Sequence, residues 1–179
     1  MALGRALDLL ACHHDGQGRL AEEAEAALAS GPDFAVMGQL RMARHVFRDV
    51  FREALGLYPP APMLVRETTG PDCFSDRIVP PGHQIVISPW HLHRHDRLWD
   101  KTDGFDPARF ATETDKQCLR KAFIPFSTGA RACPGAGRAM VEGPLLLAML
   151  VHNWRIETVT GRAPVPMAYM TVRAKDGIW

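Results

Sequence analysis

The chain reads FSTGARACPG over residues 126–135, which spaces Phe126, Gly129, Arg131 and Cys133 as Phe-x-x-Gly-x-Arg-x-Cys, followed by a further glycine at 135. Such a loop is suited to presenting one cysteine sulfur to a metal. Glycine reaches backbone angles closed to other residues, so it lets the chain curl tightly around the sulfur. Cysteine binds metals as the thiolate. The stretch therefore predicts that Cys133 is a metal ligand.

A long helix is predicted directly after this loop. Pro134 suits the first position of a helix, and residues 136–151 favour helix. Cys133 would then lie at a helix N-terminus, where unpaired N–H groups and the helix dipole favour a thiolate over a thiol. The same donors would tune an iron bound to the sulfur. A lone cysteine before a helix is usually a small buried hydrophobe, but the full motif favours a ligand.

The segment 126–135 resembles the haem-binding loop of the cytochrome P450 family, and all the defining positions match. Pro62-x-x-x-Arg66 is similar to the family's strand whose arginine reaches a haem propionate. Residues 93–110 resemble the meander that precedes the haem loop, and Ala139-x-x-Glu142 is similar to the helix after the cysteine. The resemblance covers nearly the whole chain, most specifically residues 53–66 and 90–142.

The resemblance implies a mainly α fold with a smaller β component (α+β), corresponding to a truncated C-terminal part of the cytochrome P450 fold. Residues 1–179 would form a single partial domain. Its expected parts are a helical segment at 1–57, short strands and the meander at 58–132, the helix after the cysteine at 133–152 and C-terminal strands at 153–179.

The resemblance also implies a haem b cofactor whose iron takes an axial thiolate from Cys133. The other cofactor contacts follow from position in the family's motifs. They are shielding of the sulfur by Phe126, loop turns at Gly129 and Gly135, and propionate pairing by Arg66 and Arg131.

One family motif is incomplete. The family carries Glu-x-x-Arg in the helix before the first sheet, where the two side chains share a face and join the meander arginine in a network. Here Glu53-Ala54-Leu55-Gly56 places glycine where the arginine belongs, while Arg109 stands at the meander position. We therefore expect a structural network of Glu53 and Arg109 that has lost one arm.

By resemblance, the chain descends from a monooxygenase that inserts one O2-derived oxygen atom into a small organic substrate. The expected electron donor is a ferredoxin or flavodoxin-like protein, with Arg94, Arg97 and Lys101 placed to steer it. Family members are more than twice as long, and no Gly-x-Asp/Glu-Thr-Thr oxygen-activating motif occurs here. No catalytic residue is therefore assigned, and a truncated, catalytically inactive haem-binding or non-catalytic fragment is the alternative.

The composition excludes several other classes. The chain has 179 residues, 46% hydrophobic residues and a formal charge of +1, so it lacks a basic face for nucleic acid. No apolar run is long enough to span a membrane. Cys12, Cys73 and Cys118 form no metal or disulfide pattern with Cys133, which fits a reducing cytoplasm.

A histidine-rich stretch offers a different metal site. His91-x-His93-x-His95 would place three imidazoles on one face of a strand and could hold zinc or a similar metal. On a helix only His91 and His95 would align. A His-rich non-haem metal-binding protein is therefore a second alternative.

Secondary structure is predicted from periodicity and breakers. Helices are expected at 19–29 and 36–57. Strands are expected at 63–66, 84–88, 155–159 and 167–173, with a turn at Pro81-Gly82 and a loop-rich stretch between residue 88 and the cysteine loop.

Overall fold

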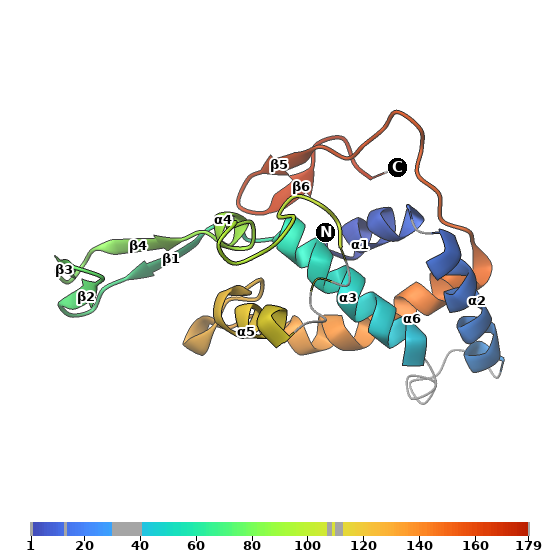
Figure 1. Cartoon of the computed structure of the whole chain (residues 1–179), viewed down its shortest axis with the longest axis horizontal. Helices are drawn as coiled ribbons and strands as arrows, with labels where there is room; N and C mark the ends of the chain where they lie inside the picture. Colours follow the sequence, from blue (N-terminus) through green and yellow to red (C-terminus); the bar gives the residue numbers. More distant parts are fainter. Residues whose placement is uncertain (1, 13, 30–40, 107–108, 110–112, 179) are drawn as a thin grey trace.

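The computed structural model describes residues 2–12, 14–29, 41–106, 109 and 113–178. A helical body carries a strand-built arm that projects from one side (Figure 1). The helices are α1 (Ala2–Ala11), α2 (His14–Leu28), α3 (Arg41–Leu57), α4 (Pro89–Leu92), α5 (Glu113–Ala122) and α6 (Ala136–Asn153), with a 3-10 turn, η3, at Gly129–Arg131. The strands are β1 (Leu64–Glu67), β2 (Asp72–Phe74), β3 (Arg77–Val79), β4 (Gln84–Ile87), β5 (Pro166–Ala168) and β6 (Val172–Ala174).

The core lies where α1, α2, α3 and α6 meet. Ala24, Ala54 and Ala148 come from three of these helices, and each is fully buried. Alanine has no side chain beyond its β-carbon, so the helices can approach closely at these points. Leu20 and Leu55 fill the space beside them and are almost completely buried. This body fixes α3, whose Phe51 contacts Phe126 of the cysteine loop, and the start of α6, which follows that loop.

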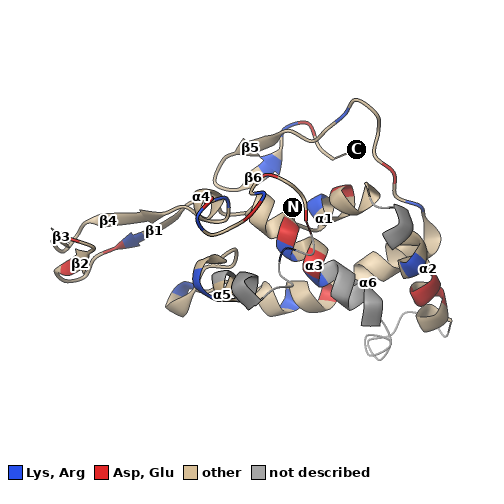
Figure 2. Cartoon of the chain, viewed as in Figure 1, with Lys and Arg blue, Asp and Glu red and all other residues tan. Residues whose placement is uncertain are grey.

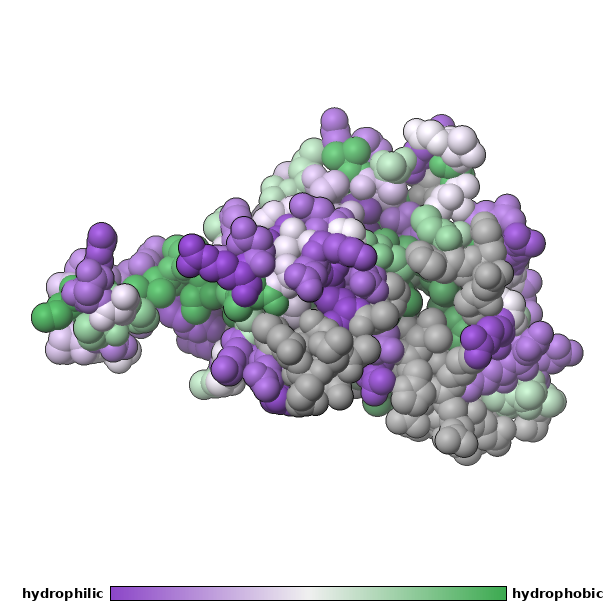
Figure 3. All heavy atoms as spheres, viewed as in Figure 1, coloured by the Kyte–Doolittle hydropathy of each residue, from purple (hydrophilic) through white to green (hydrophobic). Residues whose placement is uncertain are grey.

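The arm is a β-hairpin extended by a second hairpin at its tip. In β1 and β4, Leu64 lies opposite Ile87 and Arg66 lies opposite Ile85, in antiparallel register. β2 pairs with β3 in the same way. Apolar side chains on the arm stay exposed, as Figure 3 shows, and they include Met63, Val65 and Val86. In the described part of the chain each sheet contains two strands.

Several predicted elements are confirmed. The strands expected at 63–66 and 84–88 are β1 and β4, shifted by no more than one residue at each end. Gly82 has the positive φ of 78° that a turn after proline requires. The helix expected after the cysteine is α6, and the mainly α architecture with small sheets is as predicted.

The helix boundaries differ from the prediction at the N-terminal side. The helix expected at 19–29 begins earlier, at His14, and ends at Leu28. For the helix expected at 36–57, residues 36–40 lie outside the described residues, and α3 runs from Arg41. The stretch predicted as loop-rich is mostly loop among its described residues, and it also contains α4 and α5, which were not predicted. The hairpin of β2 and β3 was not predicted.

The C-terminal strands are the main correction. The strand expected at 155–159 is absent, because the backbone of Ile156 is paired with the side-chain amide of Gln17 instead of with another strand. Gln17 Nε2 donates to the Ile156 carbonyl at 2.7 Å, and the Ile156 N–H donates to Gln17 Oε1 at 2.9 Å. The single strand expected at 167–173 is a hairpin of β5 and β6, which reverses at residues 169–171.

Within the described ranges no helix combines the length and the apolar character needed to cross a bilayer.

Candidate functional site

The cysteine loop is held by its own backbone hydrogen bonds. The Cys133 N–H donates to the Phe126 carbonyl at 2.8 Å, and the Ala132 N–H donates to the Gly129 carbonyl at 3.0 Å. Gly129 has a φ of 67°, a left-handed conformation that favours glycine. Ser127 adopts a φ of 60° in the same loop. The result is a tight loop that leaves Cys133 as an exposed free thiol.

Gly135 serves this loop differently from Gly129. Its φ is −78°, which any residue can adopt, so the expectation that it supplies unusual backbone angles is wrong. A β-carbon at this position would lie 3.6 Å from Cys133 Sγ. Glycine therefore keeps space open beside the sulfur. Pro134 also lies one residue before the N-cap, Gly135, and not at the first position of α6, which begins at Ala136.

Phe126 anchors the loop to the helical body. Its ring is half-buried against the core, with its centroid 6.4 Å from that of Phe51 on α3. Aromatic pairs at this separation pack favourably when tilted, as here at 39°. The start of the loop is thereby fixed relative to α3.

Arg66 connects the strand arm to the same loop. Its Nη2 donates to Ser127 Oγ at 2.7 Å, while Nη1 donates to the Val65 carbonyl at 2.9 Å. Arg131 lies in η3 and is exposed. The structure thus brings Arg66 to the cysteine loop, and Arg131 belongs to that loop. Ser127 was not singled out in the sequence because it stands at an unspecified position of the Phe-x-x-Gly pattern.

Glu53 and Arg109 form a buried ion pair. Arg109 Nε lies 3.0 Å from Glu53 Oε1, and the two side chains are 9% and 2% exposed. The Asp106 N–H also donates to Oε1 at 3.0 Å. Burial raises the pKa of Glu53, and the hydrogen bond from Asp106 and the charge of Arg109 oppose that rise. The guanidinium of Arg109 is further fixed by the carbonyls of Asp100, Lys101 and Gly104.

Gly56 lies on the same turn of α3 as Glu53, where the network is incomplete. Replacing Gly56 with arginine is expected to raise the melting temperature, since a guanidinium there can reach Glu53 and since glycine costs about 1 kcal/mol within a helix. A β-carbon at Gly56 would meet only the Phe123 ring, at an ordinary 3.7 Å. Thermal unfolding followed by circular dichroism measures the change. An unchanged or lower melting temperature contradicts the expectation.

The three histidines do not converge on one point. His91 is exposed, with its Nδ1 2.8 Å from Ser88 Oγ. His93 is buried and accepts from the Ile124 N–H at 3.0 Å. His95 is exposed and accepts from the Arg97 N–H at 3.1 Å. The described residues contain no group of three or more His, Cys, Asp or Glu placed to hold a metal, which disfavours the histidine metal site.

Arg94 does not match its expected role as a surface cation. It is half-buried, donates to the Leu57 carbonyl, pairs with Asp103 at 3.3 Å and stacks 3.8 Å from the Trp90 ring centroid. These contacts tie the meander to the end of α3. Arg97 and Lys101 are exposed. Figure 2 shows basic and acidic residues interspersed over the fold.

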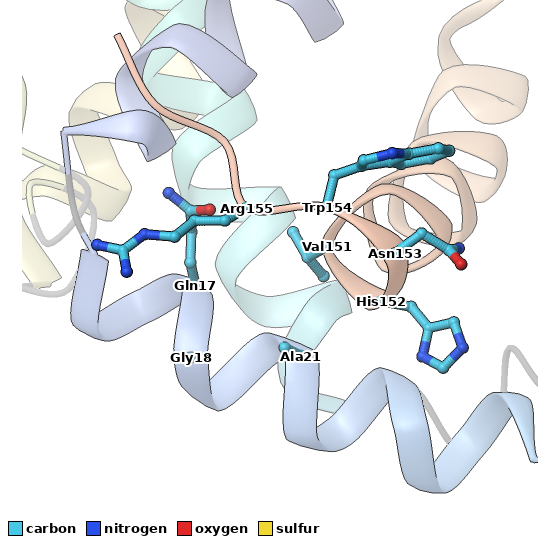
Figure 4. Close-up of a pocket in the computed structure, with 8 residues that line it drawn as sticks. All are labelled: Gln17, Gly18, Ala21, Val151, His152, Asn153, Trp154 and Arg155. Atoms are coloured by element: carbon cyan, nitrogen blue, oxygen red, sulfur yellow. The ribbon is translucent and has the colours of Figure 1, made fainter.

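A pocket of about 540 Å³ lies between α2 and the end of α6. Figure 4 shows that its lining side chains, among them Trp154, Asn153 and His152, point in different directions. Gln17 is already bonded to Ile156. None of the predicted site residues lines this pocket, so it is separate from the cysteine loop.

Comparison with known proteins agrees with the loop geometry. Residues 1–176 match the family model described as cytochrome P450. Cytochrome P450 4A10 of Mus musculus is 34% identical over 171 residues, which are 95% of this chain and 33% of that protein. Cyclooctatin synthase of Streptomyces melanosporofaciens is 36% identical over 156 residues, 84% of this chain and 34% of its own. The chain thus spans about a third of the length of these curated relatives.

A solved structure extends the likeness to three dimensions. The 6-coordinated cytochrome P450 from Thermus thermophilus superposes with a TM-score of 0.70 at 29% identity, covering 99% of this chain and 42% of that one. The family model, the relatives and the fold all support one assignment, and the chain belongs to the cytochrome P450 family, whose cofactor is an iron-containing haem.

Proposed function

We propose that this chain binds haem b through Cys133 and contributes the haem-thiolate part of a monooxygenase. The activity is insertion of one O2-derived oxygen atom into a small organic substrate, with electrons from a ferredoxin or flavodoxin-like donor. The observation that carries the proposal is the cysteine loop, where backbone hydrogen bonds hold an exposed thiol in a family-typical motif. Residues 1–179 are proposed as one partial domain of this fold.

The residues present fit the cofactor. Cys133 Sγ is exposed, and glycine at 135 leaves space beside it. Arg66 and Arg131 border the same loop and supply positive charge for two carboxylates. When bound, a thiolate-ligated haem supplies the iron chemistry that activates oxygen. The chain's own part is to hold and shield the sulfur, with Phe126 beneath the loop, and to orient the cofactor edge.

Within residues 1–179 we propose roles in binding haem, and none in activating oxygen or binding substrate. The sequence holds no Gly-x-Asp/Glu-Thr-Thr motif, and the chain spans about a third of its relatives. Oxygen-activating and substrate-binding residues are therefore proposed to come from outside residues 1–179, and haem binding without turnover is the second candidate. Arg97 and Lys101 remain candidates for docking an acidic electron donor. The free thiols of Cys12 and Cys73 fit a reducing cytoplasm.

Loss of the sulfur tests the proposal. The haem-reconstituted chain, reduced and exposed to carbon monoxide, should show a strongly red-shifted Soret band, because a thiolate donates electron density to the iron. Cys133→Ala should lose that band, while Cys73→Ala on the arm should keep it. A parent spectrum without the shift, or a shifted band that persists in Cys133→Ala, contradicts thiolate ligation.

The two loop arginines provide a graded test. Arg66→Ala and Arg131→Ala should each weaken haem affinity about 10-fold to 100-fold, since a hydrogen bond to a charged group contributes about 1.5–3 kcal/mol. Haem titration followed by absorbance measures the change. Arg77→Ala, in β3 at the tip of the arm, is the matched control and should leave affinity unchanged. Equal affinities for all four proteins exclude the propionate role.

A further inference from the structure

A narrow crevice lies beside Gly56, between the end of α3 and the meander. We name it the Gly56 crevice; its lining includes Glu53, Gly56, His93, Thr102, Arg109 and Phe123. Most of these residues have ordinary polar or packing contacts. The ring of His93 stacks on Phe123 with centroids 4.9 Å apart. The crevice therefore borders both the buried ion pair and a buried imidazole.

Within the part of the chain that the structure describes, one nitrogen of His93 lacks a hydrogen-bond partner. The residue is 6% exposed, and Nδ1 is buried and unpaired. Nε2 accepts from the Ile124 N–H at 3.0 Å, so Nε2 carries no proton and the neutral ring has its proton on Nδ1. Desolvation lowers the pKa of His93 to about 4, which keeps the ring neutral near pH 7. His93 thus presents a buried N–H donor that needs an acceptor.

Hydrogen-bond acceptors lie near His93 at this crevice. The carbonyls of Leu55 and Gly56 belong to the last turn of α3, where helix carbonyls have no partner within the helix. They lie close enough to raise the pKa of His93, although neither is in hydrogen-bond geometry with Nδ1. Among the described residues, Glu53 Oε2 accepts a hydrogen bond from Arg109 Nε at 3.2 Å, and a carboxylate oxygen can accept more than one. A bridging group would have to accept from Nδ1–H and donate to these oxygens.

Size and chemistry select the group. The volume that the centre of a water molecule can reach inside the crevice is about 10 Å³. On this measure, a cavity of about that size is the smallest that holds one water. Guanidinium and ammonium ions have only donors, so neither can accept a hydrogen bond from Nδ1–H. We infer that the Gly56 crevice binds one water molecule, which accepts from His93 Nδ1–H and donates to the end of α3 and to Glu53.

This hydration site accounts for the glycine in the Glu-x-x-Gly motif. The water occupies the space that an arginine at position 56 would fill, and it satisfies the buried imidazole that faces the crevice. Arg109 alone then provides the positive charge that pairs with Glu53. The water links α3 to the meander. The inference concerns the apoprotein and does not depend on haem binding.

Nitrogen-15 NMR of the histidine rings tests the inference. His93 should show a protonated Nδ1 and an unprotonated Nε2 at pH 7, and its Nδ1–H should give a dipolar cross-peak to a water that stays bound for longer than nanoseconds. The opposite tautomer, or no cross-peak to water, overturns the inference. His91 and His95, both exposed, are internal controls that should show only fast-exchanging water.

Matched arginine variants provide the second measurement. Gly56→Arg should lose the water cross-peak, because the side chain fills the crevice. Gly18→Arg, on an exposed position of α2 with open space around it, should keep the cross-peak. Guanidinium chloride at low millimolar concentration should not raise the melting temperature of the parent chain. A saturable rise that disappears in Glu53→Gln would show that the crevice takes a cation and would overturn the water assignment.

Discussion

Arg109→Met is expected to lower the free energy of unfolding by about 3–5 kcal/mol, because it leaves the buried carboxylate of Glu53 without its charged partner. Glu53 is 1% exposed, so bulk solvent cannot replace the lost positive charge. The substitution also removes donors from the carbonyls of Lys101 and Gly104. Urea unfolding of the apoprotein measures the change. Methionine keeps similar bulk, so the loss reflects the ion pair more than a cavity.

Arg138→Met is the matched control. Arg138 pairs with Glu142 at 2.7 Å, but the two side chains are 78% and 47% exposed. Exposed pairs along a helix contribute only about 0.3–0.5 kcal/mol. A loss in Arg109→Met no larger than that in Arg138→Met would show that Glu53 and Arg109 do not support the fold.

The cost of Arg109→Met should depend on pH. Burial raises the folded-state pKa of Glu53 above its ordinary value of 4.5. A carboxyl with a raised folded pKa contributes most to stability below the unfolded pKa, and that contribution is lost as pH rises through the folded pKa. Removing Arg109 should raise the folded pKa further. The stability difference between variant and parent should therefore be larger at pH 7 than at pH 5, and a difference independent of pH would contradict this.

Gln17→Leu is expected to destabilise the chain by about 2–4 kcal/mol. Each polar group left unsatisfied on burial costs about 1–3 kcal/mol. Gln17 is 6% exposed, and its amide satisfies both the N–H and the carbonyl of Ile156. It also lies 3.4 Å from the Leu10 carbonyl. Leucine fills a similar volume, so the loss is attributable to hydrogen bonds.

Two readouts separate this effect from general damage. Urea unfolding gives the free energy, and hydrogen exchange should show that the Ile156 amide loses protection more than the amides in the middle of α6. Gln84→Leu on β4 is the control, because Gln84 is exposed. Equal stability changes in the two variants would show that Gln17 is not a structural link.

Local patterns predicted the cysteine loop and the helix after it. Their determinants lie within a few residues, as with Gly129 and its positive φ. The contribution of Gly135 could not be found this way, since it depends on the distance from a β-carbon to the sulfur. The segment 155–159 has strand-like residues, but its partner is the Gln17 side chain, far away in sequence. Arg94 looked like a surface cation because sequence does not show burial against Trp90.

The strand arm also has a mechanical consequence. The arm projects from the body and is attached to it at one end. At that end, Ser88 Oγ donates a hydrogen bond to the Pro62 carbonyl. Further along the arm, the hydrogen bond from Arg66 to Ser127 connects β1 to the cysteine loop. A force on the tip of the arm would therefore act, through this hydrogen bond, at a point six residues before Cys133.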